Sequence, residues 1–229
     1  MQRAVMGPTA TVIAMADVVE LSSDELLSTT RAVRKRLDFD RPVPLELILE
    51  CIGLAQQAPT GSNAQGWHFI IVTDPAKKRA IGDLYAKAFN VYRNLPTYAG
   101  AIQTGDEQRD AQQGRVATSA DYLSEHMGEA PALVIPCISG RVGAANAAGA
   151  LGSILPASWS FMLAARARGL GTCWTTLHLM FEKEAADVLG IPFDNVSQAL
   201  LTPVAYTKGT DFKPATRPAP STITHINGW

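Results

Sequence analysis

Residues 152–177 read GSILPASWSFMLAARARGLGTCWTTL, and this stretch decides the fold. Its first part, up to Arg168, is apolar on nearly all sides of a helix, which is typical of a helix buried at the centre of a domain. Gly169 predicts the end of that helix, and residues 170–177 follow as a predicted strand. A buried helix that leads directly into a strand indicates helices packed on a central sheet.

Patterns on both sides of this stretch extend the same architecture. Apolar residues at helical spacing predict helices at residues 21–37, 43–58, 75–89, 116–127 and 181–190, with bases in the last turn of the first. Runs rich in β-branched and aromatic residues predict strands at 67–74, 131–139 and 199–206. Pro136 places the second of these strands near a sheet edge or a bulge. The order of elements implies an α+β domain.

Two long segments lack any periodicity. Residues 90–113 are polar and rich in turn formers, which predicts a lid or excursion, a binding segment or a disordered loop. Residues 207–229 contain several prolines, and ordering them costs about 1–2 kcal/mol per residue. Such a tail is either disordered or lies on another surface, and its terminal Trp229 favours a tail that wraps a second copy of the chain. Residues 22–229 are expected to form one domain.

Bulk composition excludes several classes of protein. With 47% apolar side chains and a net charge of −1, the chain is typical of an ordinary globular protein rather than one that binds nucleic acid. Its three cysteines follow neither a disulfide pattern nor a metal-ligand pattern, so we expect a reducing, cytoplasmic location. No uninterrupted apolar run approaches the ~18 residues of a membrane span, so no membrane segment is expected.

The first sixteen residues, MQRAVMGPTATVIAMA, allow three interpretations. A signal peptide is disfavoured, because Gly7 and Pro8 interrupt the apolar run and Arg3 alone makes a weak basic region. We expect residues 1–21 to be a flexible N-terminal extension, or the true start to be Met15.

Common catalytic patterns are missing from the sequence. The histidines His68, His126, His178 and His225 are not spaced as metal ligands, and no nucleophile or phosphate-loop motif occurs. Cys173 lies in an apolar strand without an evident cation nearby, which predicts an inert thiol. A chain with anion-binding groups and no proton-transfer machinery is typical of a protein whose bound cofactor carries the chemistry.

Two stretches offer groups for such a cofactor. Residues 29–44, TTRAVRKRLDFDRPVP, concentrate positive charge that either binds an anion or forms a solvated helix face, and on charge alone the solvated face is favoured. Residues 58–67, APTGSNAQGW, place hydroxyls and amides between a helix end and a strand, with glycines that let the backbone approach a ligand. A plain turn accounts for the second stretch equally well.

Taken in order, four stretches resemble the landmarks of the FMN-dependent nitroreductase family. They are TTRAVRKRLDFDRPVP, AQQAPTGSNAQGWHFIIV, LAARARGLGTCWTTL, and LLTPVAY followed later by RPAP. The resemblance extends from about Ser23 to the C-terminus. It implies a nitroreductase-like α-β-α sandwich with a mostly antiparallel sheet, and a homodimer whose FMN sites lie at the subunit interface.

The resemblance also implies that arginines from both ends of the chain hold FMN. Arg31 and Arg217 match residues that bind the phosphate, and Arg34 matches a basic residue near the phosphate or the flavin N1/O2 edge. Ala32 occupies a position where the family often has Ser, so one hydroxyl contact is missing. Guanidinium groups suit this role because they form bidentate, charge-assisted hydrogen bonds. The two remaining arginines of the stretch are expected to be solvated: Arg36 and Arg41.

Two further segments are implied to line the flavin. One, contributed by the other subunit, consists of Pro59, Thr60, Asn63 and Gln65, although Gly66 replaces a Pro of the family. The other, along the ring, consists of Trp174, Thr175 and Thr176. Three aromatic residues of the lid region are candidates for stacking on planar acceptors, with core packing as the alternative: Phe89, Tyr92 and Tyr98.

The implied activity is that of an NAD(P)H-dependent oxidoreductase. Hydride passes from NADPH or NADH to flavin N5 and then, in a ping-pong cycle, to a nitroaromatic or quinone acceptor. No catalytic side chain and no metal is implied, because the flavin carries the reaction. Two alternatives stay open: other flavin chemistry on the same fold, such as reductive dehalogenation or flavin destruction, and a flavin-binding carrier or sensor without turnover.

Overall fold

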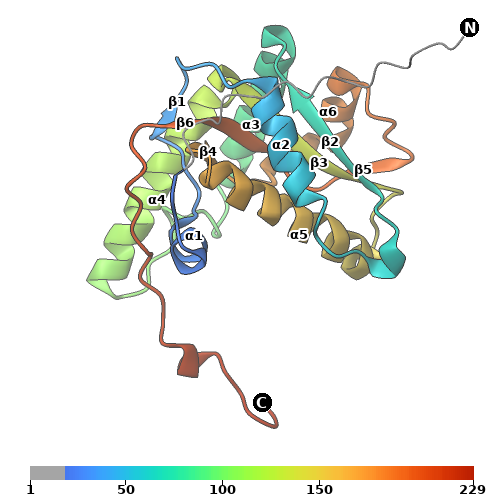
Figure 1. The fold of residues 1–229 in the computed structure, drawn as a ribbon. Helices are drawn as coiled ribbons and strands as arrows, with labels where there is room; N and C mark the ends of the chain where they lie inside the picture. The colour runs from blue at the N-terminus through green and yellow to red at the C-terminus, as the bar shows by residue number, and fades with distance from the viewer. Residues whose placement is uncertain (1–18) are drawn as a thin grey trace, which may run out of the picture.

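The computed structural model describes residues 19–229, which form three layers with helices on both faces of a central sheet (Figure 1). The helices are α1 (Ser23–Thr29), α2 (Leu45–Ala55), α3 (Pro75–Tyr92), α4 (Glu107–His126), α5 (Ala147–Arg166) and α6 (Glu182–Leu189). The strands are β1 (Leu37–Asp38), β2 (Trp67–Val72), β3 (Ala132–Ser139), β4 (Leu170–Thr172), β5 (Val196–Gln198) and β6 (Thr202–Thr207). Short 3₁₀ turns are η1 (Gly61–Asn63), η2 (Met127–Glu129), η3 (Leu177–Phe181) and η4 (Pro220–Thr222). This architecture confirms the predicted α+β sandwich.

The expectations for the N-terminus fall almost wholly outside the described residues. The predicted extension covers residues 1–21, and the signal-peptide and start-site interpretations concern residues 1–16. Of this segment the structure describes residues 19–21, where the Val19 amide donates to the Ala167 carbonyl at 2.9 Å.

All named strand pairs of the sheet are antiparallel. Strand β3 pairs with β2 along its length, and it also pairs with β6 through residues 132–134 and with β5 through residues 137–139. Strand β6 pairs with β3, β4 and β1, and its Val204 is matched both to Ala132 and to Thr172. Strand β6 is therefore flanked on both sides, and the C-terminal tail leaves from the interior of the sheet.

Alternate residues of β3 bury into opposite helical layers, as the two-residue period of a strand requires. Ala132 and Val134 pack in a cluster with α2 and α5, whereas Leu133 and Ile135 pack in a cluster with α3, α4 and α6. All four side chains are fully buried. The sheet therefore separates two hydrophobic clusters, one on each face, and β3 contributes side chains to both.

Helix α5 provides the apolar surface that its sequence predicts. Among the described residues, α5 is long and apolar enough to cross a membrane, as judged by length and composition alone. In the fold it packs against α2, and its Phe161 and Met162 are buried between α2 and the sheet. Helix–sheet packing accounts for its apolar sides.

Helix α1 is shorter than predicted, so the arginines do not lie in its last turn. The hydroxyls of Thr29 and Thr30 donate to backbone carbonyls of the preceding turn at 2.6 Å each, and Thr30 is extended. The Val33 amide then donates to the Thr172 carbonyl at 2.8 Å, which draws the chain alongside β4. The basic residues therefore lie in a short non-helical connection, which turns at residues 34–37 where the Leu37 amide donates to the Arg34 carbonyl at 3.0 Å, rather than on a helix face.

The predicted irregular segment, residues 90–113, is partly helical. Helix α3 continues to Tyr92, and α4 begins at Glu107, where the Asp106 carboxylate caps it by accepting from the Arg109 amide at 2.8 Å. Turns and irregular structure occupy residues 93–106. The second half of α4 agrees with the helix predicted at residues 116–127, whereas the first half was not predicted because it is polar on most sides, which hides the helical period. That this region covers a binding site stays a prediction.

Two strands, β1 and β5, were not predicted because two or three residues are too few to show a period. The expected edge position of Pro136 is wrong, because β3 is an internal strand. Pro136 instead lies where the partner of β3 changes from β6 to β5, and its carbonyl accepts from the Ala199 amide at 2.9 Å. Proline has no backbone N–H to donate. At this junction between the two partner strands, the missing donor costs no hydrogen bond of the sheet.

Candidate functional site

A cleft of about 300 Å³ brings together residues from distant parts of the chain. Arg34 lines it from the turn between α1 and β1, and Trp174, Thr175 and Thr176 line it from just beyond the end of β4. The remaining walls come mostly from α3 and α4 and include Tyr85, Tyr92, Val116 and Ala120. We call this the Arg34 cleft. It gathers four of the residues predicted to bind the cofactor, together with the lid candidate Tyr92.

Backbone hydrogen bonds fix the strand-end wall of the Arg34 cleft. The Thr175 amide donates to the Leu201 carbonyl at 3.0 Å, and the Leu201 amide donates to the Thr175 carbonyl at 2.8 Å. One position before Trp174, the Cys173 amide donates to the Thr202 hydroxyl at 3.0 Å. These bonds tie the wall to the start of β6, so Trp174 is presented from rigid backbone.

Arg34 supplies the charge of the cleft. Its half-buried side chain approaches the Ser119 hydroxyl at 3.4 Å, a long and weak contact. Burial raises the pKa of the neighbouring Tyr85 phenol to about 12, although the charge of Arg34 opposes this. The cleft therefore combines a cation with a neutral phenol, and none of the residues lining it carries a carboxylate.

The environment of Cys173 differs from the expected one, because a cation does lie nearby. Burial raises the pKa of this thiol, and Arg34 acts in the opposite direction through its charge and a hydrogen bond. Burial is the larger effect, so the thiol stays neutral. This environment agrees with an inert Cys173, but the reason is burial of the thiol and not the absence of a cation.

The residues predicted to hold a phosphate lie around the C-terminal tail. Arg31 donates to the Lys213 carbonyl at 2.6 Å, and Ala32 forms a bridge with Thr172 of β4. Arg217 lines a second cleft, of about 520 Å³, between α4 and the tail. The tail thus contacts both Arg31 and the α4 side, but within the described residues no hydrogen bond or ion pair links Arg31 to Arg217.

The predicted loop residues lie elsewhere. The loop around η1 is on the side of the molecule opposite α1 and the tail (Figure 1), and it lines neither cleft. Asn63 and Gln65 have φ of 51° and 48°, a left-handed conformation that costs free energy in residues other than glycine. Gln65 donates to the Asn63 side chain at 2.8 Å and to the Thr60 hydroxyl at 3.3 Å, while Pro59 precedes them. That this loop completes a partner's site stays a prediction.

The three aromatic candidates form one cluster with ring centroids 5.4–6.2 Å apart. Phe89 is only 1% exposed and belongs to the core, whereas Tyr92 lines the Arg34 cleft. Tyr98 donates to the Asp121 carboxylate at 3.1 Å. Tyr92 is the member of the three that is placed to meet a ligand in this cleft.

Arg36 and Arg41 were predicted to be solvated, and this prediction is wrong because both side chains have partners in the fold. Arg36 pairs with the Asp211 carboxylate at 2.7 Å and donates to the Lys208 carbonyl at 2.9 Å. The guanidinium of Arg41 lies 3.5 Å from the centre of the Tyr206 ring. Both arginines therefore serve the packing of β6 and the tail that follows it.

Arg166 was missed altogether. It ends α5, is only 4% exposed, and donates to the Thr210 carbonyl at 2.9 Å. The guanidiniums of Arg36 and Arg166 lie 4.2 and 4.8 Å from the centre of the Phe212 ring, within the range of cation–π attraction. An arginine at the end of an otherwise apolar helix, with an isolated phenylalanine in the tail, was the available signal.

The histidines line neither cleft. His178 is fully buried, its two ring nitrogens lack partners among the described residues, and burial lowers its pKa to about 4. Within residues 19–229, no group of three or more His, Cys, Asp or Glu side chains is placed to hold a metal ion.

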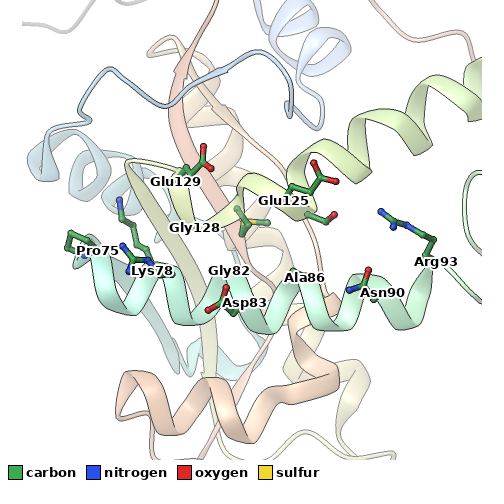
Figure 2. A pocket seen from close by; sticks show the side chains of 13 residues that line it. Pro75, Lys78, Gly82, Asp83, Ala86, Asn90, Arg93, Glu125, Gly128 and Glu129 are labelled. Atoms are coloured by element: carbon green, nitrogen blue, oxygen red, sulfur yellow. The ribbon is translucent and has the colours of Figure 1, made fainter.

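A groove of about 530 Å³ follows α3 on another part of the surface. Figure 2 shows its lining of mixed charge, with Lys78, Asp83 and Arg93 on α3 and with Glu125 and Glu129 opposite. None of the residues predicted to bind a cofactor lies there. Its size alone does not make it the site, because the groups that suit a flavin are in the Arg34 cleft.

An antiparallel α-β-α sandwich with a cationic, aromatic-lined cleft at the end of a strand defines the class of this protein. The family model described as "Nitroreductase family" matches residues 27–206. The chain belongs to the nitroreductase family, which is a family of enzymes.

Curated relatives match shorter segments. Iodotyrosine deiodinase 1 of Rattus norvegicus is 38% identical over 111 residues, which is 48% of this chain and 35% of the relative. Chloronitrobenzene nitroreductase of Comamonas testosteroni is 32% identical over 73 residues, which is 32% of this chain and 30% of the relative. The match thus spans about a third of the length of either relative.

Solved structures agree over nearly the whole chain and show the fold. Iodotyrosine deiodinase bound to FMN and 3-iodo-L-tyrosine superposes with a TM-score of 0.66 at 21% identity, covering 90% of this chain and 99% of that one. The FMN- and NADPH-dependent nitroreductase NfnB of Sphigopyxis sp. strain HMH gives a TM-score of 0.65 at 21% identity, covering 91% and 100%. The nitroreductase-like fold is therefore established, and FMN is bound by at least one protein that shares it.

Proposed function

We propose that this protein is an FMN-dependent oxidoreductase that passes hydride from NADPH or NADH to a nitroaromatic or quinone acceptor. The observation that carries the proposal is the Arg34 cleft, in which a cation, Trp174 and two threonine hydroxyls converge from separate segments. An aromatic wall suits a planar heterocycle, and threonine hydroxyls can bond to its polar edge. The residues present therefore fit a flavin.

When bound, FMN supplies the redox chemistry, accepting a hydride from a nicotinamide and giving it to an acceptor. Arg34 stabilises negative charge on a ligand in this partly desolvated cleft, where a fixed cation is more effective than in water. Tyr85 stays protonated, because burial raises its pKa to about 12, so at neutral pH it is a hydrogen-bonding phenol and not an anionic base. No side chain of the cleft is required to act as a general base.

We assign the phosphate of the cofactor to Arg31, which donates to the Lys213 carbonyl of the tail, and to Arg217, which belongs to the tail and lines the second cleft. In a homodimer, the loop of residues 59–65 would reach the cofactor of the other subunit. The exposed Ile223, Ile226 and Trp229, which are 76–104% exposed here, would be covered by that subunit. A cytoplasmic location belongs to the same proposal.

A second candidate is reductive dehalogenation of an aromatic substrate. It is favoured by the match to the rat deiodinase, which is longer and of higher identity than the match to the chloronitrobenzene nitroreductase. The two candidates share the cofactor and the electron donor and differ in the acceptor.

Purified protein tests the proposal by colour and kinetics. We expect FMN to co-purify, to bleach in a stopped-flow mixer with a reduced nicotinamide nucleotide, and to regain colour when a quinone or nitroaromatic is added. Recovery only with an iodinated phenol supports the second candidate. Colour that neither nucleotide bleaches indicates a flavin carrier, and a protein that takes up no FMN contradicts every flavin role.

A variant tests the phosphate assignment. Arg31→Ala should weaken FMN binding about tenfold, because a charge-assisted hydrogen bond contributes about 1.5–3 kcal/mol. Flavin retention through gel filtration and fluorescence titration of the apoprotein measure the change. The exposed Lys77→Ala is a matched control that removes one positive charge from α3. Full retention of FMN by Arg31→Ala, with folding unchanged, refutes the role of Arg31.

A further inference from the structure

The second cleft, between α4 and the tail, carries more positive charge than the Arg34 cleft. We call it the arginine cleft, and it is lined by Asp106, Gln108, Arg109, Gln112, Gln113, Arg115, Thr216, Arg217 and Pro218. Three of these residues are arginines and one is an acid. That acid, Asp106, is already engaged in capping α4.

Among the described residues no salt bridge engages the arginines of this cleft, although the pKa of the adjacent Asp110, which is lowered mainly by hydrogen bonds from a threonine, is lowered further by the charge of Arg109. Within residues 19–229, no ion pair or side-chain hydrogen bond engages Arg109 or Arg115, and Arg217 donates only to the carbonyl of Thr216 at 3.1 Å. Neutral glutamines stand between them. Unpaired guanidiniums around a concave surface, with amides to complete the hydrogen bonds, suit a phosphate.

Helix α4 joins the arginine cleft to the Arg34 cleft. Val116 and Ala120 line the Arg34 cleft, whereas Arg109 and Arg115 line the arginine cleft. At the α-helical rise, the Cα atoms of Arg109 and Ala120 are about 16 Å apart along the axis. A ligand that meets both clefts must be long, with a planar ring at one end and a phosphate near the other.

We infer that the arginine cleft binds the 2′-phosphate of NADPH and that the protein therefore prefers NADPH to NADH. This inference rests on the proposed function, which leaves the choice of donor open. With the nicotinamide at the Arg34 cleft, the adenosine end of the dinucleotide extends along α4 toward Arg109 and Arg115, which leaves Arg217 for the flavin phosphate. NADH lacks only the phosphate, so it loses the contacts with these arginines and keeps the others.

Direct binding tests the inference without turnover. Adenosine 2′,5′-bisphosphate and adenosine 5′-monophosphate, which differ in the 2′-phosphate, are titrated into the purified protein by calorimetry. The wild type should bind the bisphosphate more tightly. The Arg109→Gln/Arg115→Gln variant should lose about tenfold in affinity for the bisphosphate and little for the monophosphate. Lys77→Gln/Arg79→Gln removes the same charge from the exposed face of α3 and should bind both as the wild type does.

Kinetics give a second readout on the same proteins. The ratio of kcat/KM for NADPH to that for NADH should exceed one in the wild type and fall about tenfold in Arg109→Gln/Arg115→Gln, with NADH turnover retained. Equal use of both nucleotides by the wild type, or an unchanged ratio in the variant, overturns the inference.

Two other outcomes separate this inference from the proposed function. If Arg109→Gln/Arg115→Gln loses its FMN, the cleft holds the flavin phosphate and the inference is wrong, while the proposed function stands. If the wild type binds no FMN, the proposed function fails. The titrations with the two adenosine nucleotides then still decide whether the cleft selects a 2′-phosphate.

Discussion

The C-terminal tail meets two sets of arginines, and the two sets do different work. Along residues 208–213, Arg36 and Arg166 donate to tail carbonyls and lie against the Phe212 ring. Along residues 216–218, Arg109 and Arg115 stand across an open cleft and are exposed. The first set contacts the fold through its guanidinium groups, whereas the second has no salt bridge among the described residues and is the set that we propose to bind a ligand. The partners of an arginine, rather than the local density of charge, thus separate the two uses.

The largest expected effect comes from removing the most buried member of the first set. Arg166→Ala takes a donor from the Thr210 carbonyl, removes the contact with Phe212 and leaves a void at the end of α5. We expect the free energy of unfolding to fall by about 3 kcal/mol, as for other large buried side chains cut back to alanine. Urea denaturation measures this loss.

Arg166→Met is the matched control, because it keeps most of the volume without the charge. Two nitrogens of Arg166, Nε and Nη1, lack partners among the described residues, so burying this charge has a cost that Met avoids. We expect Met to recover most of the lost stability. Equal destabilisation by Ala and Met would show that charge, and not packing, makes the contribution of Arg166.

His178 is a second buried basic residue, and it differs from Arg166 because histidine can lose its proton and arginine cannot. Burial lowers its pKa from 6.5 to about 4, with Glu182 acting in the opposite direction. Below pH 6.5 the unfolded chain therefore binds a proton that the folded chain does not. The stability associated with neutral His178 is complete above pH 6.5 and is lost as the pH falls toward 4.

The corresponding measurement is the free energy of unfolding at two pH values. We expect it to be about 2 kcal/mol lower at pH 5 than at pH 7 on account of this residue. His178→Phe should remove that part of the pH dependence while keeping an aromatic ring in the core. A slope between pH 7 and pH 5 that is the same in this variant would assign the acid sensitivity to other groups.

The smallest expected effect comes from Arg36, the more exposed of the two arginines whose guanidiniums lie against the Phe212 ring. Arg36→Met breaks the pair with Asp211, whose side chain is 90% exposed, and we expect a loss of less than about 1 kcal/mol. Salt should reduce the difference between wild type and variant, because it screens exposed charges. Thermal unfolding at low and high ionic strength measures both effects. A loss of stability as large as that of Arg166→Ala would show that the exposed Arg36 contributes as much to the fold as the buried Arg166.

Much of the fold could be predicted from sequence, because long apolar patterns determine it. The helix of residues 147–166 and the strand of residues 132–139 bury enough side chains to leave a clear period. The end of α1 at Thr29 could not be predicted in this way, since it depends on the pairing of Val33 with Thr172 far along the chain. The short strands β1 and β5 likewise exist only through their partners.

The site could be predicted in part. The cleft walls from Trp174 to Thr176 and the cation Arg34 were found through the resemblance to a family, and the structure places them together. The roles of Arg36 and Arg166 depend on where the tail folds back, which no local pattern records. Arg109 lies in the segment predicted to be irregular, and Arg115 lies just before the helix predicted at residues 116–127, although both are exposed residues of α4.

Strand β6 lies inside the sheet, with β4 on one side and β3 and β1 on the other. This position divides the last thirty residues into two parts of very different tolerance to truncation. A chain cut after Thr207 retains every strand of the sheet and loses the segment that carries Arg217. A chain cut a few residues earlier loses the strand that holds the two halves of the sheet together, and with it the domain.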